Sequence, residues 1–185
     1  MKDFKADIVN PVEIVHELID NSDGFLAFGT VSGPSPSPTH HHFGALTETD
    51  VSDNIAGEHF RNDPRNDGWP FLSLVQIAFA DRVPYILMSD MTDHTRNIVN
   101  DNRVSLLIDG TKGKNRMDSA RVALMGRAKI VDKAEHRDMF LKQHSSAKAY
   151  FDFDDFRLYT VEFTHARLNA GFGKAFWLDK DELDG

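Results

Sequence analysis

The stretch WPFLSLVQIAFADRVPYILMSDMTDHTRNIVN, residues 69–100, contains most of the information on the fold. Two runs rich in branched and aromatic residues, Phe71–Phe79 and Val83–Ser89, stand on either side of Asp81-Arg82, so they predict a β-hairpin with a tight turn. The segment Thr92–Asn100 predicts a helix in which Thr92 or Asp93 is the N-cap. The stretch therefore predicts two antiparallel strands followed directly by a helix.

Short apolar segments continue on both sides of this hairpin. They predict strands over Phe25–Val31, Arg103–Asp109, Arg121–Val131, Phe156–Phe163 and Arg167–Leu178, and helices after Asn10 and from Asp132 to about Ser145. About seven strands joined mostly by short polar links favour an antiparallel sheet, and strands that are apolar on both faces favour its closure into a barrel. With no internal repeat and no domain boundary, we expect one domain over residues 1–185.

The segment Gly33–Gly68 departs from this pattern. Prolines at 34, 36 and 38 precede His40-His41-His42, and a polar run with His59 follows. Alternating prolines prevent a sheet ladder, and about 35 residues without periodicity exceed an ordinary loop. We interpret the segment as an insertion, either a solvated surface loop or a functional excursion whose histidines could bind metal.

Composition excludes several classes of protein. Acidic residues number 29 against 21 basic ones, for a net charge of −8, which disfavours binding to nucleic acid or to an anionic membrane. The absence of cysteine excludes disulfides, zinc–thiolate sites and cysteine nucleophiles. No apolar run approaches the ~18 residues of a membrane span, and the N-terminus lacks the apolar core of a signal peptide. These features predict a cytoplasmic protein.

The junction after Val83–Ser89 has the residues of an anion site. Ser89, Thr92 and Thr95 offer hydroxyl groups, Arg96 offers a planar fork of donors, and a helix start adds free backbone N–H groups. Such residues suit a phosphate or a carboxylate. The alternative is a capped helix with one solvent-exposed arginine.

A second candidate segment is Gly171-Phe172-Gly173-Lys174-Ala175-Phe176-Trp177. The two glycines allow close approach of a planar ligand to the backbone, Phe172 and Trp177 offer stacking faces, and Lys174 offers a cation. The alternative is a bulged core strand in which Trp177 is buried.

Several segments together resemble the FMN-binding split β-barrels related to pyridoxamine 5′-phosphate oxidase, and most closely the HugZ-type subgroup associated with haem utilisation. The matching segments are Trp69–Val75, Leu87–Asp90, His94–Asn97, Arg103–Leu107, Asp155–Leu158 and Gly171–Ala175. The resemblance implies a six-stranded antiparallel split barrel with about three flanking helices. It also implies a homodimer with FMN bound at the subunit interface.

The resemblance implies a set of cofactor residues. In such proteins the phosphate of FMN lies against the residues that match Ser89, Thr95 and Arg96, and His94 lies in the same turn. The strand from Ser73 to Gln76 would follow the flavin edge. The full set is Ser73, Leu74, Val75, Gln76, Ser89, His94, Thr95, Arg96, Arg121, Phe172, Lys174 and Trp177. The resemblance implies no metal ligand and identifies no catalytic residue.

Three departures from the family pattern bear on function. Phe71 and Gln76 stand where the oxidases carry basic residues, and no motif with arginine and histidine follows Trp177. Oxidation of pyridoxamine phosphate is therefore not expected. HugZ-type proteins take an axial histidine from a C-terminal segment, but here no histidine follows His165.

Three functions stay open at this level. The first is an FMN-dependent oxidoreductase that acts on a small-molecule redox substrate. The second is a haem-binding or haem-degrading protein in which His40–His42 or His59 would replace the missing axial ligand. The third is a dimeric regulatory module without a cofactor.

Overall fold

The computed structural model describes residues 10–32, 68–111 and 118–184, and its centre is one antiparallel sheet. The strands are β1 (Phe25–Val31), β2 (Pro70–Ala80), β3 (Val83–Ser89), β4 (Arg103–Asp109), β5 (Arg121–Val131), β6 (Phe156–Asn169) and β7 (Ala175–Asp179). Their order is β3-β2-β1-β4-β5-β6-β7. A further pairing of β3 with β6 closes the first six strands into a barrel, which confirms the predicted fold class.

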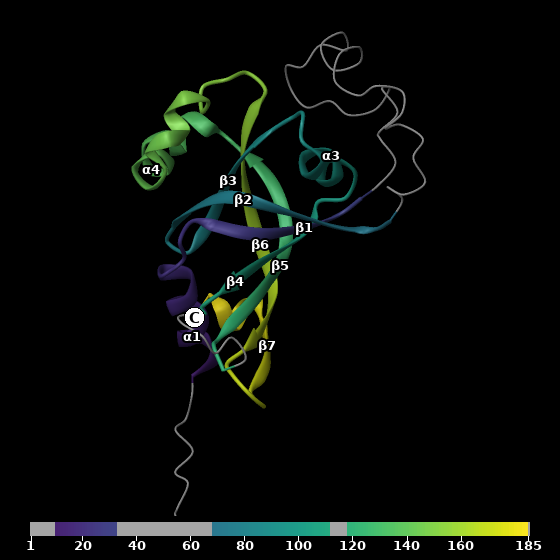
Figure 1. Ribbon diagram of the computed structural model, residues 1–185, viewed down its shortest axis with the longest axis vertical. Helices are drawn as coiled ribbons and strands as arrows, with labels where there is room; N and C mark the ends of the chain where they lie inside the picture. Colours follow the sequence, from purple (N-terminus) through teal and green to yellow (C-terminus); the bar gives the residue numbers. More distant parts are fainter. Residues whose placement is uncertain (1–9, 33–67, 112–117, 185) are drawn as a thin grey trace, which may run out of the picture.

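Strand β6 is the longest strand, and it pairs with β3 near one end of the molecule and with β7 near the other. Its first residues pair with β3, with Phe156 opposite Ser89. Its last residues pair with β7, with Arg167 opposite Trp177. Figure 1 shows β6 running the length of the barrel, with α3 and α4 near one end and β7 near the other.

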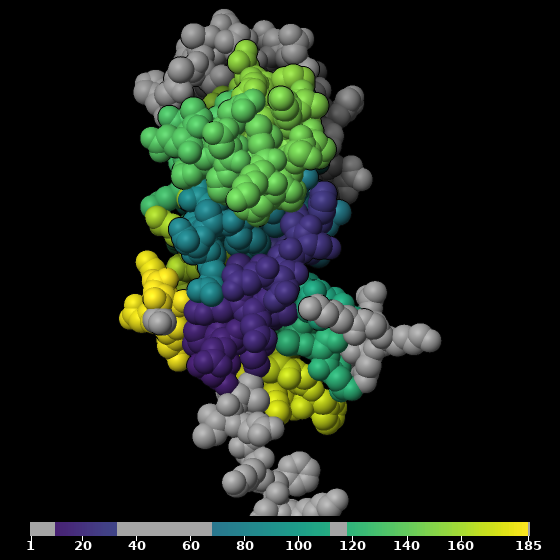
Figure 2. Space-filling view, turned by 90° about the vertical axis from the view of Figure 1, so that its left-hand side faces the viewer, coloured from purple at the N-terminus to yellow at the C-terminus, as the bar shows by residue number. Residues whose placement is uncertain are grey.

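The helices are α1 (Pro11–Asp20), α3 (Asp93–Asn100), α4 (Lys133–Gln143), the 3₁₀ helix η2 (Ser145–Ala149) and the short α5 (Lys180–Leu183). Two of the longer helices, α1 and α4, begin at residues whose side chains cap them, whereas the side chain of Thr92 makes no capping hydrogen bond at the start of α3. The side chain of Asn10 accepts a hydrogen bond from the backbone N–H of Val12, and Asp132 accepts one from Ala134. In Figure 2, α4 (green) covers the upper part of one face of the molecule and α1 (purple) covers the middle.

Two groups of buried side chains hold these elements together. The barrel interior contains Phe28, Ile77, Leu106, Leu124 and Leu168 among others, all fully buried. A second group lies under α4 and contains Phe140, Phe151 and Leu158. The face of the sheet opposite α1 has no helix over it among the described residues (Figure 1).

The hairpin and the central strands follow the prediction. Asp81 and Arg82 both have positive φ, +49° and +63°, as the tight turn between two twisted strands requires. The last two strands correct it. Strand β6 continues through residue 169, and β7 begins only at Ala175, because Gly171 and Gly173 adopt positive φ in a turn that the sequence analysis had assigned to a strand.

The insertion and its four histidines lie outside the described residues. No helix in the described ranges is both long and apolar enough to cross a bilayer.

Candidate functional site

Ser89 lies at the end of β3 with both hydrogen-bonding roles of its hydroxyl in use. It is buried, its Oγ donates to the carboxylate of Asp155 at 2.6 Å, and it accepts from the backbone N–H of Met91 at 3.1 Å. The backbone reinforces this link, because the N–H of Asp90 donates to the carbonyl of Asp155 at 2.7 Å. The hydroxyl predicted to bind phosphate thus joins β3 to the start of β6.

Thr95 and Arg96 also face protein partners at the start of α3. Thr95 is buried and its hydroxyl lies 2.9 Å from that of Thr92. The guanidinium of Arg96 donates to the carboxylate of Asp93 at 3.1 Å and to the carbonyl of Met91 at 2.8 Å. The three residues predicted to bind phosphate are brought together, but both hydroxyl protons and two nitrogens of the guanidinium already have acceptors in the protein.

A carboxylate and a guanidinium lie beside this turn. Arg157 donates to both carboxylate oxygens of Asp90 at 3.0 Å, and both side chains are about three-quarters buried. Burial raises the pKa of Asp90, and the hydrogen bond from Arg157 opposes that rise. The carboxylates of Asp90 and Asp93 already pair with Arg157 and Arg96, and Asp155 accepts from Ser89, so the polar groups of the turn satisfy one another.

His94 is half-buried in the first turn of α3 and lies edge-on to Phe28, with ring centroids 6.1 Å apart. Burial lowers its pKa, so the imidazole is neutral at pH 7.

The residues predicted along β2 divide between its two faces. Val75 is buried in the barrel, and Ser73 on the same side has a buried Oγ without a hydrogen-bond partner among the described residues. Leu74 points outward and is 71% exposed. Gln76 accepts a hydrogen bond from the hydroxyl of Tyr150 at 2.9 Å. A ligand on one face of β2 would therefore meet only alternate members of this set.

The remaining predicted residues lie around β7. Phe172 is 87% exposed and lies with Lys174 in the turn between β6 and β7, while Arg121 begins β5. Trp177 is 60% exposed on β7 and stacks with Arg167, whose guanidinium carbon is 5.2 Å from the ring centroid. The alternative of a buried Trp177 is wrong, because nothing in residues 10–32, 68–111 and 118–184 covers this side of the sheet.

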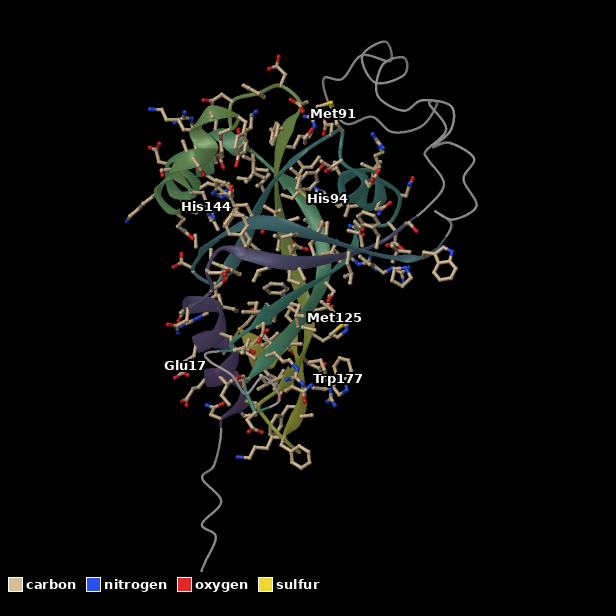
Figure 3. The ribbon with its side chains drawn as sticks, in the orientation of Figure 1. Glu17, Met91, His94, Met125, His144 and Trp177 are labelled. Carbon is tan, nitrogen blue, oxygen red and sulfur yellow. The ribbon has the colours of Figure 1, made fainter. Side chains whose placement is uncertain are left out.

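These two groups of predicted residues are far apart within one chain. Phe156 on β6 lies opposite Ser89, and Arg167 lies opposite Trp177. Eleven residues of β6 separate the two positions, which corresponds to about 36 Å along the strand. Figure 3 shows His94 in the upper part of the molecule and Trp177 in the lower part. One cofactor could contact both groups only if they came from different chains.

The outer sheet face is the uncovered apolar surface that the sequence analysis missed. In register across the sheet it contains Leu72, Leu74, Ala27, Gly29, Ser105, Leu107, Ala123, Met125, His165, Arg167 and Trp177. Leu72 and Leu74 are more than 70% exposed, and the residues between the large side chains are small. Figure 3 shows Met125 and Trp177 on this face, on the side away from α1. A broad, shallow apolar surface of this kind suits a flat ligand or a second protein surface.

Two clefts also open on the surface. One of about 680 Å³ lies between the end of α3 and β5, and its wall includes Arg127, Lys129 and Tyr159. Burial raises the pKa of Tyr159 to about 12. The other, of about 470 Å³, lies beside the β2–β3 turn. Neither is lined by a residue of the predicted cofactor set.

Comparisons with known proteins place haem-related proteins among the relatives. The chain is 29% identical over 132 residues to the non-canonical haem oxygenase HOZ, chloroplastic, of Arabidopsis thaliana. The matched region covers 69% of this chain and 40% of HOZ. The fold of this chain matches a haem-binding protein from Mycobacterium smegmatis with a TM-score of 0.68 at 22% identity, over 95% of this chain and 61% of that one. It also matches the haem storage protein HutZ from Vibrio cholerae with a TM-score of 0.52 at 14% identity, over 92% and 96% of the two chains.

This chain spans less than two thirds of the length of HOZ and of the mycobacterial protein. The structural matches support the split-barrel resemblance seen in the sequence. The model of the CREG β-barrel family matches residues 59–183, about two thirds of the chain, and the protein therefore belongs to the CREG β-barrel family.

Proposed function

We propose that this protein binds haem, and that the haem lies on the outer sheet face. The observation that carries the proposal is the combination, on one uncovered face, of exposed apolar side chains with an imidazole, His165, and a guanidinium, Arg167. Haem has a flat apolar ring, an iron that prefers nitrogen ligands, and two carboxylates that favour cations. HOZ and the mycobacterial protein are described as haem proteins, which supports the same reading.

The residues present on this face fit such a ligand. Small residues such as Ala27, Gly29 and Ala123 leave the middle of the sheet smooth, so that a planar ring can approach it. Among the described residues Arg167 makes no hydrogen bond or ion pair, and its donors are available to a propionate. When bound, haem would supply redox chemistry, and the protein would supply binding and orientation.

The second part of the proposal is a homodimer with the haem at the subunit interface. Leu72, Leu74 and Leu107 extend the exposed apolar surface across the sheet from Trp177, and a second copy related by two-fold symmetry would bury them. The same arrangement would bring the α3 turn of one chain to the β7 region of the other. It removes the separation of about 36 Å between the two groups of predicted residues.

FMN is the second candidate, and one observation favours it. Ser89, Thr95 and Arg96 gather at a strand–turn–helix junction, as an FMN phosphate site requires. Haem ranks first because the donors of these residues are already engaged with Asp155, with Thr92 and with Asp93. We would infer an FMN-dependent reaction with a small-molecule redox substrate only if the purified protein retained flavin.

The test is to mix the purified protein separately with hemin and with FMN and to remove free ligand by gel filtration. The proposal predicts a retained, shifted Soret band with hemin and no retained flavin absorbance. Retained flavin without haem would favour the FMN-dependent oxidoreductase. Retention of neither would favour a cofactor-free dimeric module. Loss of the Soret band on addition of ascorbate in air would extend the proposal to haem degradation.

A further inference from the structure

Strand β6 contains a β-bulge that decides which of its side chains face outward. Opposite β5, Phe163 pairs with Gly126 and His165 pairs with Met125, so that Thr164 is an extra residue without a partner. Gly126 makes room for this bulge. A Cβ at that position would lie 2.2 Å from the carbonyl oxygen of Glu162.

The bulge reverses the alternation of the strand. Tyr159 and Val161 point into the barrel before the bulge, whereas Ala166 and Leu168 point inward after it. Without the extra residue, His165 would continue the inward series, since a shift of one residue moves a side chain to the other face. The bulge therefore places His165 on the outer sheet face.

Hydrogen bonds at the bulge also select the tautomer of His165. The hydroxyl of Thr164 donates to the carbonyl of Met125 at 3.2 Å, and its oxygen lies 2.8 Å from Nδ1 of His165. Because the only hydroxyl proton of Thr164 goes to that carbonyl, Nδ1 must carry the proton and donate to Thr164 Oγ1. In this tautomer of the neutral ring the lone pair of Nε2 is available, which is the form in which imidazole binds a metal.

The surroundings of His165 suit a porphyrin. Its ring lies 5.7 Å from that of Trp177, and Arg167 lies over the same indole. Met125 lies directly opposite His165 on β5. The site thus offers an imidazole nitrogen, an aromatic and a thioether surface, and one cation.

Other described histidines are less suited to the role. His144 is buried with Nε2 at 2.7 Å from the carbonyl of Ile77, and His16 Nε2 lies 3.2 Å from the carbonyl of Leu183. His94 is half-buried against Phe28. His165 Nε2 has no hydrogen-bond partner within the described part of the chain.

We propose that Nε2 of His165 is the axial ligand of the haem iron and that Thr164 is its positioning residue. The inference rests on the proposed haem function and assigns the ligand that the sequence analysis had sought in the insertion. It requires no residue beyond the C-terminal strand. Thr164 acts by holding the ring of His165 and its tautomer.

The experiment is titration of hemin into the full-length wild type and into the variants His165→Ala, Thr164→Val and His136→Ala. Soret spectra and, after reduction, the iron–histidine stretching band in resonance Raman spectra are recorded. His165→Ala should lose that band, and added imidazole should restore it. Thr164→Val should bind hemin about tenfold more weakly and shift the band, because the Nδ1–H of His165 loses its acceptor. His136 is the matched control, since it lies on α4, where its ring packs against Tyr85 of β3 and not on this face.

The outcomes separate this inference from the proposed function. If the wild type retains no hemin, the haem function itself is wrong. If the wild type binds hemin and His165→Ala keeps an unchanged stretching band, only the assignment of His165 is wrong. Loss of the band in His94→Ala, or in a variant without the histidines at 40–42 and 59, would overturn it equally. Circular dichroism establishes that each variant is folded.

Discussion

The substitution Gly126→Ala tests the role of the β-bulge in the fold. An added Cβ would lie 2.2 Å from the carbonyl oxygen of Glu162, 2.8 Å from its carbon and 2.9 Å from Cα of Phe163. All three atoms belong to the backbone of β6, so no side-chain rotation relieves the contact. Overpacking of this kind costs about 1–3 kcal/mol, and we expect a loss of about 3 kcal/mol because the bulge itself must move.

Gly29→Ala in β1 is the matched control. Its added Cβ would meet a methyl group of Leu72 at 3.5 Å and Ser105 at 3.6 Å, which are ordinary contacts. The expected change in unfolding free energy is therefore small and of either sign.

Urea-induced unfolding followed by tryptophan fluorescence measures both variants. A loss of about 3 kcal/mol corresponds to a drop in melting temperature of about 6–12 °C for a chain of this size. The reasoning is refuted if Gly126→Ala unfolds within about 0.5 kcal/mol of the wild type, or if Gly29→Ala loses as much.

Three further predictions concern groups around the α3 turn. Lys133 donates to three backbone carbonyls at 2.8–3.2 Å, so Lys133→Met should lower the unfolding free energy by about 2 kcal/mol in a urea titration. Lys129→Met is the control, because it removes only an exposed ion pair and should change the unfolding free energy little. Arg157→Met should cost about 2–3 kcal/mol because it leaves the mostly buried Asp90 without its counterion, and adding Asp90→Asn should recover part of that loss; no recovery in the double variant would contradict the pairing. Burial holds the pKa of His94 below the 6.5 of the unfolded chain, so the unfolded state binds the proton first as pH falls and wild-type stability is lost below about pH 6.5. His94→Gln should show a shallower fall between pH 7 and pH 5, and equal slopes would refute this.

Much of the barrel was predictable because its strands alternate or run apolar over whole segments. The spans Val83–Ser89, Arg103–Asp109 and Arg121–Val131 agree with the structure residue for residue. The starts of two helices were predictable as well, because Asn10 and Asp132 are residues whose side chains cap helices, and both do so here.

The errors occur where the outcome depends on a distant strand. The bulge at Thr164 interrupts the alternation of β6, and its cause, the missing side chain of Gly126, is far away in the sequence. The turn at Gly171 and Gly173 depends on two positive φ values that a strand-like composition conceals. The short helices Ser145–Ala149 and Lys180–Leu183 have too few residues to show a period.

The candidate site was predictable only in part for the same reason. The resemblance named Ser89, Thr95 and Arg96 as neighbours, and they are neighbours. It could not show that the hydroxyl of Ser89 already has an acceptor, because Asp155 lies more than sixty residues further along the chain, in the turn before β6. His165 was not predicted as a site residue, since only the register of β6 with β5 and β7 places it beside Trp177.

Gel filtration with coupled light scattering and absorbance detection, after incubation with hemin, measures haem binding and dimerisation in one experiment. We expect a Soret band that co-elutes with a species of twice the chain mass of 20.9 kDa, with about one haem per chain. A monomer that elutes without Soret absorbance would contradict both the haem function and the interface that completes its site.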